Sequence, residues 1–199
     1  MYTGELVITE CNVQFLLQTS NLLNLTNVKE ACGQFIQSQL DTSNCLGIRE
    51  FADFHSCPIL QKHADAFIEQ YFSEIILKDE YLNLNIDQVI NLVSKDHLSV
   101  NSEKVIYSAV LKWINHDPIN RNSYLNQLIT HVRFALMDSK DLVELAQDTF
   151  VKDNSFLQDL VLKSLHYKLC ISNSDETDIT CLNLNPRTPL GLPKVNYSI

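Results

Sequence analysis

The amino-acid sequence predicts an all-α fold built from antiparallel helix pairs. Apolar residues recur at spacings of three and four from residue 12 to residue 169, the pattern of amphipathic helices. The 199 residues include only 4 glycines and 5 prolines. Sandwiches, barrels and doubly wound α/β folds need many turn residues, so this scarcity favours helices joined by short polar loops.

The first third of the chain begins with a segment of a different kind. Residues 1–9 contain alternating apolar side chains and predict a short strand, for which the chain supplies no second strand as a partner. Helical spacing then starts near Val13. Asn27 with Glu30 predicts a capping box for a helix that ends near Leu40, and the polar run 41–43 predicts the start of the next helix.

The remaining helices have clear start and stop signals. Pro58 stands where a first helical residue is favoured, and Asn85 with Gln88 forms another capping box. Ser102 caps a helix that must stop at Asp117, because the residue before a proline avoids the helical region. Two more helices are predicted over residues 139–147 and 154–169. The polar, proline-rich residues 171–199 predict a linker or a disordered tail.

Composition excludes several functional classes. The net charge of −9 has the wrong sign for a surface that neutralises phosphates, so no nucleic-acid partner is expected. No apolar run approaches the roughly 20 residues of a membrane span, and no membrane association is expected. The six cysteines form no C-x-x-C pair, which indicates free thiols in a reducing compartment.

No catalytic constellation emerges from the sequence, so an enzyme is not expected, nor a cofactor or a metal ion. The group His55, Cys57 and His63 has no zinc-ligand spacing. The run Ser94-Lys95-Asp96-His97 places reactive side chains in different directions on a helix end, and the acid pair Asp79-Glu80 is interpreted as solvated surface. These observations alone predict a soluble helical interaction domain.

Several segments resemble the BTB, BACK and Kelch-like family. Tyr2–Leu6, Asn12–Gln14 and Asn21–Leu23 look like the closing strand and last helix pair of a BTB domain, and the resemblance continues through Val28–Cys32 and Gln37–Asp41. Ser43–Arg49 with Phe51–Asp53 and Cys57 resembles the 3-box that opens the BACK domain. His131–Arg133, His166–Leu169 and Pro186–Pro189 then follow in the family's order. The resemblance is strongest to the Kelch-like 2/3 group.

The resemblance implies a domain organisation and a role. It divides the chain into the C-terminal part of a BTB domain (1–40), the 3-box and BACK domain (41–170) and a linker toward a Kelch propeller (171–199). Kelch-like proteins are non-catalytic substrate adaptors of cullin-3 RING ubiquitin ligases, in which the BTB domain and 3-box hold the cullin and the propeller holds the substrate. The residues that match segments facing or shaping the cullin groove are Asn24, Leu25, Lys29, Asn44, Cys45, Ile48 and Phe51.

Some of these residues have a structural alternative. Cys45 and Ile48 also lie on an apolar stripe and could be core residues, and Gly47 is interpreted as a position that permits close helix packing. The resemblance further implies that the dimerisation helix, the hydrophobic-x-Glu contact and all Kelch blades are absent, so that cullin-3 binding is weak and substrate binding is lost. Apolar side chains left without their BTB partners, expected at Val13, Leu16, Leu17 and Leu22, would favour self-association.

A second function class stays open beside the ligase adaptor. Some Kelch proteins organise actin, so a helical interaction scaffold associated with the cytoskeleton is the alternative. The expected localisation is cytoplasmic, with the cytoskeleton and the nucleus as variants of that expectation.

Overall fold

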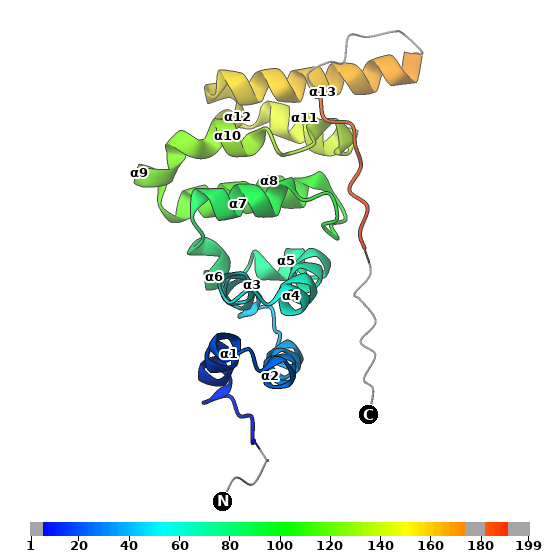
Figure 1. The fold of residues 1–199 in the computed structure, drawn as a ribbon. Coiled ribbons are helices and arrows are strands. Elements are labelled where there is room, and N and C mark those ends of the chain that lie inside the picture. Colours follow the sequence, from blue (N-terminus) through cyan, green and yellow to red (C-terminus); the bar gives the residue numbers. More distant parts are fainter. Residues whose placement is uncertain (1–5, 174–181, 191–199) are drawn as a thin grey trace, which may run out of the picture. The chain divides into compact units, whose positions relative to one another are not determined.

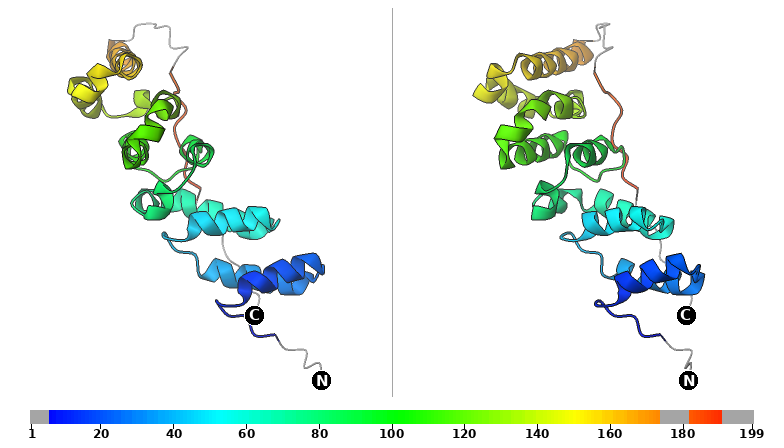
Figure 2. Two further views of the ribbon diagram at one scale, coloured as in Figure 1. Left: turned by 90° about the vertical axis from the view of Figure 1, so that its left-hand side faces the viewer. Right: turned by 60° about the vertical axis from the view of Figure 1, so that its left-hand side comes forward.

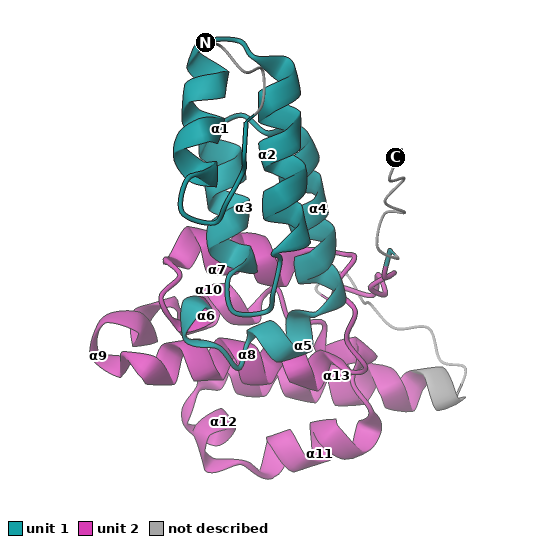
Figure 3. Ribbon diagram, turned by 90° about the horizontal axis from the view of Figure 1, so that it is seen from below, with its two compact units in different colours: residues 1–80, 190–199 teal, residues 81–189 magenta. Residues whose placement is uncertain are grey.

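A computed structural model describes residues 6–173 and 182–190, and these residues confirm the all-α prediction. They form α-helices and two short 3-10 helices, with no strand among them. The strand expected at the start of the chain is not formed by residues 6–9, and residues 1–5 lie outside the described part. The chain divides into two compact units, residues 1–80 with 190–199 and residues 81–189 (Figure 3). Each unit is described by itself.

Unit 1 consists of two helix hairpins followed by short helices (Figure 1). In the first hairpin α1 packs against α2, and in the second α3 packs against α4. The helices of this unit are α1 Val13–Leu22, α2 Thr26–Ser38, α3 Cys45–Phe54, α4 Pro58–Gln70, α5 Phe72–Ile75 and the first residues of α6 Asp79–Leu82.

The two hairpins of unit 1 share one apolar core. Its buried members come from all four long helices: Val13, Leu17, Cys32, Ile36, Ala52, Cys57 and Leu60. The prediction that Val13 and Leu17 are left exposed is therefore wrong, because both side chains pack within the unit against α2 and the second hairpin. The prediction is confirmed for Leu22, with 85% of its surface accessible, and Phe15 of the same helix, which was not predicted, exposes 71%.

Both hairpins turn in the same way. Asn24 follows α1 with a positive φ of 53°, and Ser56 follows α3 with a φ of 51°. The next residue in each case donates its backbone N–H back across the last turn, from Leu25 to Ser20 and from Cys57 to Ala52, both at 2.8 Å. This pattern is the Schellman motif, which asparagine tolerates well at the left-handed position and serine tolerates less readily.

Two predicted helix starts in unit 1 differ from the structure. α2 begins at Thr26 without a side-chain cap, so the capping box at Asn27 and Glu30 is not formed. The run 41–43 makes a local turn in which the Asp41 carboxylate accepts from Ser43, and α3 begins only at Cys45. Pro58 does occupy the first turn of α4, as predicted.

The start of α3 is satisfied by a distant carboxylate. The Glu80 side chain accepts backbone N–H groups from Leu46 at 3.1 Å and from Gly47 at 2.6 Å. A helix N-terminus has unpaired N–H groups and a positive dipole end, so an anion there is stabilising. Glu80 is thus a helix cap, in contrast to the solvated surface role predicted for the pair Asp79-Glu80. A Cβ atom on Gly47 would lie 2.9 Å from the same carboxylate, so this glycine makes room for Glu80.

Unit 2 is also helical (Figure 2). Its central helix α8 carries seven buried residues, among them Trp113, whose indole Nε1–H donates to the Leu84 carbonyl at 2.9 Å. The Tyr81 hydroxyl, fully buried, donates to the Ala109 carbonyl at 3.0 Å. The helices are α7 Ile86–Ser94, α8 Glu103–His116, α9 Pro118–Arg121, α10 Leu125–Ile129, α11 Ser139–Gln147, α12 Thr149–Asp153 and α13 Ser155–Asn173, with 3-10 helices at Asn122–Tyr124 and Phe134–Leu136.

The predicted boundaries in unit 2 are largely confirmed. Asn85 and Gln88 form the capping box of α7, the Ser102 hydroxyl accepts from the N-terminus of α8, and α8 ends at His116 before Pro118. α11 covers the predicted range 139–147, while α13 runs four residues beyond the predicted end.

Part of the predicted disordered tail is ordered. Residues 182–190 are extended (Figure 1), and they are held by hydrogen bonds that the Arg187 side chain and the Thr188 N–H donate and by one that the Asn185 carbonyl accepts. Hydrogen bonds of this kind leave no apolar periodicity in the sequence from which the attachment could be predicted. Residues 174–181 and 191–199 lie outside the described part.

The described cysteines are free thiols. Cys32, Cys45, Cys57 and Cys170 are buried, and Cys11 is exposed. Cys181 lies outside the described residues.

The contact between Gly47 and Glu80 leads to a stability prediction. Ala is favoured over Gly in a helix by about 1 kcal/mol, so Gly33→Ala, with open space around its Cβ position, should stabilise the protein by about 0.5–1 kcal/mol. Gly47→Ala should lose this gain, because the added Cβ forces the Glu80 carboxylate away from the two N–H groups that it accepts from. We expect the Gly47→Ala variant to be less stable than Gly33→Ala by about 1–2 kcal/mol. Urea unfolding of the two variants measures the difference. Equal stability of the two alanine variants would show that the Glu80 cap contributes nothing.

Candidate partner-binding groove

A groove of about 490 Å³ opens in unit 1 between the end of α1, α2 and the start of α4. Its polar lining comes from the α1–α2 hairpin, including Asn24, Lys29 and Gln34, and its apolar lining comes from the first turn of α4. The residues that line it are Ser20, Asn21, Asn24, Thr26, Lys29, Glu30, Gly33, Gln34, Gln37, Cys57, Pro58, Ile59 and Leu60.

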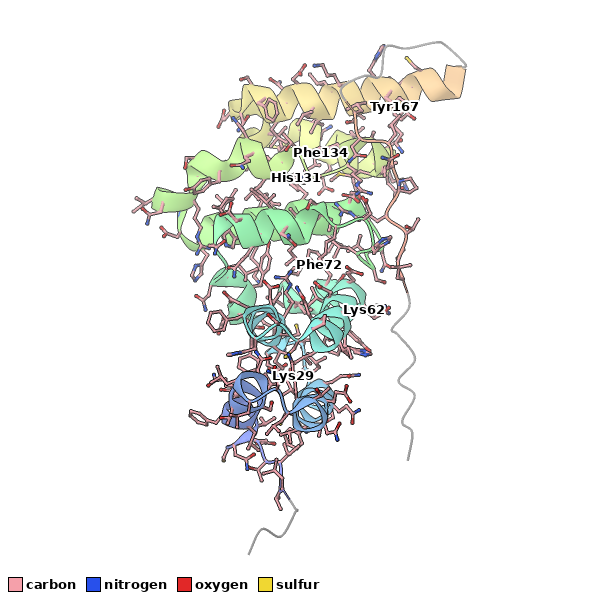
Figure 4. All side chains as sticks on the ribbon, viewed as in Figure 1. Lys29, Lys62, Phe72, His131, Phe134 and Tyr167 are labelled. Atoms are coloured by element: carbon pink, nitrogen blue, oxygen red, sulfur yellow. The ribbon has the colours of Figure 1, made fainter. Side chains whose placement is uncertain are left out.

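The geometry of the groove depends on the two Schellman turns. Lys29 of α2, labelled in Figure 4, joins them. Its Nζ donates to the Asn21 side-chain oxygen at 2.8 Å and to the Ser56 carbonyl at 2.9 Å. Asn21 Nδ2 in turn donates to the His55 carbonyl at 3.1 Å. These bonds hold the end of α1 and the α3–α4 turn together. Side-chain hydrogen bonds therefore fix the spacing between the two hairpins at the groove.

The wall formed by α4 is apolar and accessible. Ile59 exposes 65% of its surface, while Leu60 directly after it is buried in the shared core. Cys57 lines the groove and its Sγ–H lies 3.5 Å from the His55 carbonyl. Burial raises the pKa of the Cys57 thiol, an effect that the nearby Lys29 ammonium opposes. The thiol is therefore a neutral, weakly polar part of the lining at ordinary pH.

The seven residues predicted from the resemblance fall into two groups. Asn24 and Lys29 line the groove, and Leu25 beside them exposes 48% of its surface. The other four residues lie on or next to α3 and have structural contacts.

Each of the four α3 positions has a packing or capping role. Cys45 is fully buried, and burial raises the pKa of its thiol to about 12. Ile48 and Phe51 are partly buried against the shared core, and Phe51 contacts His55 with ring centroids 4.4 Å apart. Asn44 closes the loop before α3 by accepting from the Asp41 N–H and donating to the Gln39 carbonyl.

Sequence reasoning missed Ile59 and Gln34. Ile59 follows Pro58 and lies off the apolar stripe of α4. An apolar side chain outside the stripe of a helix indicates exposed apolar surface, so this residue could have been predicted as a candidate contact. Gln34 and Gln37 carry no such signal, because polar residues on the outer face of a helix are common. Among the described residues, no group of three or more His, Cys, Asp or Glu side chains is placed to hold a metal ion, and no helix is long and apolar enough to cross a membrane.

Comparison with known proteins identifies the family of the chain. The family model "BACK: BTB And C-terminal Kelch" matches residues 45–147, and the BTB/POZ domain model matches residues 1–40. The chain belongs to the BTB–BACK family of Kelch-like proteins. It is 39% identical to human Kelch-like protein 2 and 40% identical to human and mouse Kelch-like protein 3, in each case over 196 residues, or 98% of the chain. It spans about a third of the length of these relatives.

In this BTB–BACK protein the two family matches meet inside unit 1. α1 and α2 lie in the BTB match, whereas α3 and α4 lie in the BACK match, and the shared core joins them. The groove is accordingly lined by residues from both matches.

The bridging role of Lys29 leads to a prediction. Lys29→Met keeps the length and apolar stem of the side chain but removes both hydrogen bonds, so the free energy of unfolding should fall by about 1–2 kcal/mol. Lys62→Met is the matched control, because Lys62 is exposed on α4 of the same unit, and its effect should stay within about 0.5 kcal/mol (Figure 4). Thermal or urea unfolding decides the matter, and equal effects of the two substitutions would contradict the bridge.

Proposed function

We propose that this chain is the cullin-binding part of a non-catalytic substrate adaptor of a cullin-3 RING ubiquitin ligase. The observation that carries the proposal is the groove of unit 1, which is lined by the last BTB helix and the first turn of α4. Two residues predicted for cullin contact, Asn24 and Lys29, line it, and Leu25 is exposed beside it.

The lining of the groove suits a protein segment. Interfaces combine an apolar centre with a polar rim, and a few anchors in the centre supply most of the binding energy. Here Pro58 and Ile59 provide accessible apolar surface, while Asn24, Thr26 and Gln34 surround it with donors and acceptors. We infer that an apolar side chain of the cullin packs on Ile59 and that polar groups of its backbone meet the rim.

The α3 positions have an indirect part in this proposal. Ile48 and Phe51 pack α3 against the shared core, Cys45 is buried at the start of the same helix, and we infer that this packing fixes the direction of Ile59. A charged residue at Ile48 or Phe51 should therefore weaken cullin binding through loss of packing. Circular dichroism would register that loss together with the binding defect.

The remaining parts of the proposal follow from the family. We propose a cytoplasmic protein whose substrate is selected by Kelch repeats of a longer protein, as in the propeller-containing architecture that the resemblance implies. The actin-associated scaffold is the second candidate, and binding to purified cullin-3 separates the two. The self-association expected from the α1 face would now rest on Phe15 and Leu22, which are the exposed apolar residues there.

A pair of substitutions tests the groove. The chain should bind the N-terminal region of cullin-3 in the micromolar range, and Ile59→Asp should weaken this binding about 30-fold or more, as expected for the loss of an anchor worth about 2 kcal/mol. Ile119→Asp is the matched control. Ile119 exposes 95% of its surface in unit 2, so the same change of chemistry there should leave the affinity unaltered.

Isothermal titration calorimetry with purified cullin-3 measures both variants. Absence of binding by the unaltered chain would overturn the proposed function. Equal affinity of the Ile59→Asp and Ile119→Asp variants would show that cullin-3 does not use this groove.

A further inference from the structure

Unit 2 contains a socket that surrounds a single arginine side chain. Arg187 belongs to the extended segment 182–190, here called the strap, and only 3% of its side chain is accessible. Its Nε donates to Glu103 Oε1 at 2.6 Å and its Nη2 donates to Glu103 Oε2 at 3.2 Å, a two-pronged ion pair with a carboxylate that is itself 6% accessible.

Backbone carbonyls take the remaining donors of this guanidinium. Nη1 donates to the Val93 carbonyl at 2.9 Å and to the Lys95 carbonyl, both at the end of α7. Nη2 also donates to the His131 carbonyl at 3.2 Å. A guanidinium has five N–H donors, and each of the five has an acceptor here. The socket therefore matches the shape of arginine, and lysine could not make the same set of bonds.

A second arginine reaches from unit 2 to the strap. Arg133, 3% accessible, donates from Nη1 to the Asn185 carbonyl at 2.6 Å and from Nη2 to the Asp96 carboxylate. Its backbone N–H donates to Glu103 Oε2 at 3.1 Å. The Nε of Arg133 is buried and finds no acceptor in the part of the chain that the structure describes. Unlike Arg187, this side chain is thus not surrounded by a complete set of acceptors.

Backbone bonds of the strap complete the attachment. The Thr188 N–H donates to the Asp96 carbonyl at 2.8 Å, and His97 Nδ1 lies 2.9 Å from the Thr188 carbonyl, to which it donates. Apart from the Arg187 side chain, residues 185–190 are exposed. One anchored side chain flanked by main-chain hydrogen bonds is how short extended peptides are recognised by separate proteins.

We propose that unit 2 carries a binding site for an extended arginine-bearing peptide, and that residues 185–188 of the same chain occupy this site. The site is formed by Glu103, Asp96, Arg133 and the carbonyls at residues 93, 95 and 131. The strap is a ligand supplied in cis, and the site accepts the same segment supplied in trans when the strap is withdrawn. Withdrawal leaves the Glu103 charge buried without its cation, so an empty site strongly favours the return of a guanidinium. This inference is independent of the groove in unit 1.

The test uses the full chain with Arg187→Ala and a fluorescent synthetic peptide of residues 182–190. Fluorescence anisotropy should show that this variant binds the peptide with an affinity at least about tenfold higher than that for a peptide in which alanine replaces Arg187. The unaltered chain is the matched control. Its site is occupied, so its apparent affinity for the arginine peptide should be lower than that of the variant by a similar factor.

The folding of the variant is followed at the same time. If Arg187→Ala lowers the unfolding temperature, the arginine peptide should raise it again in a concentration-dependent manner, whereas the alanine peptide should not, because a ligand stabilises only the state that binds it. A folded variant that binds neither peptide, or both equally, would overturn the proposal. An unfolded variant that the arginine peptide cannot rescue would overturn it as well, and would identify the strap as an inseparable part of the fold.

Discussion

The buried carboxylate of Glu103 is the constraint on which unit 2 depends. A charge removed from water must be compensated by a counter-charge and by hydrogen bonds, or it destabilises the fold by several kcal/mol. Glu103 stands in the first turn of α8, where the helix dipole favours an anion, and it accepts from the Arg133 backbone and from two atoms of Arg187. The start of α8, the loop before the second 3-10 helix and the strap therefore meet at one carboxylate, and the end of α7 joins them through Arg187. Through Arg187 this carboxylate also ties the strap to the start of α8.

Unit 1 is organised by a different kind of interaction. Its four long helices share an apolar core, and that core decides which predicted partner-binding residues can be reached by another protein. Cys45 is buried, and Ile48 and Phe51 are partly buried against the core. The Asn44 side chain is hydrogen-bonded within the loop before α3. The residues left for contact lie where the two hairpins turn, because the Schellman turns and the Lys29 bridge bring polar groups beside the exposed first turn of α4.

Much of the fold could be predicted from the sequence, and the misses have a common cause. Local signals were sufficient at α7, whose capping box uses residues three apart, and at the end of α8, where Pro118 prevents continuation. Local signals failed at α3, since the group that caps it is Glu80, more than thirty residues away.

Local signals also failed at the strap. Asp96 and His97 were interpreted as an ordinary helix end, and Arg187 as part of a linker, because the contacts that join them span about ninety residues of sequence.

The same reasoning explains why the groove was predicted only in part. A resemblance to a family points to stretches of sequence, and three of the residues to which it points, Asn24, Leu25 and Lys29, lie in or beside the groove. It does not distinguish a residue that contacts a partner from one that positions the contact. That distinction depends on burial, and burial is set by the packing of α3 and α4 on the BTB helices. Ile59 illustrates the point: its neighbours Pro58 and Leu60 are explained by the helix start and the core, and only the packed structure shows that the side chain between them remains available.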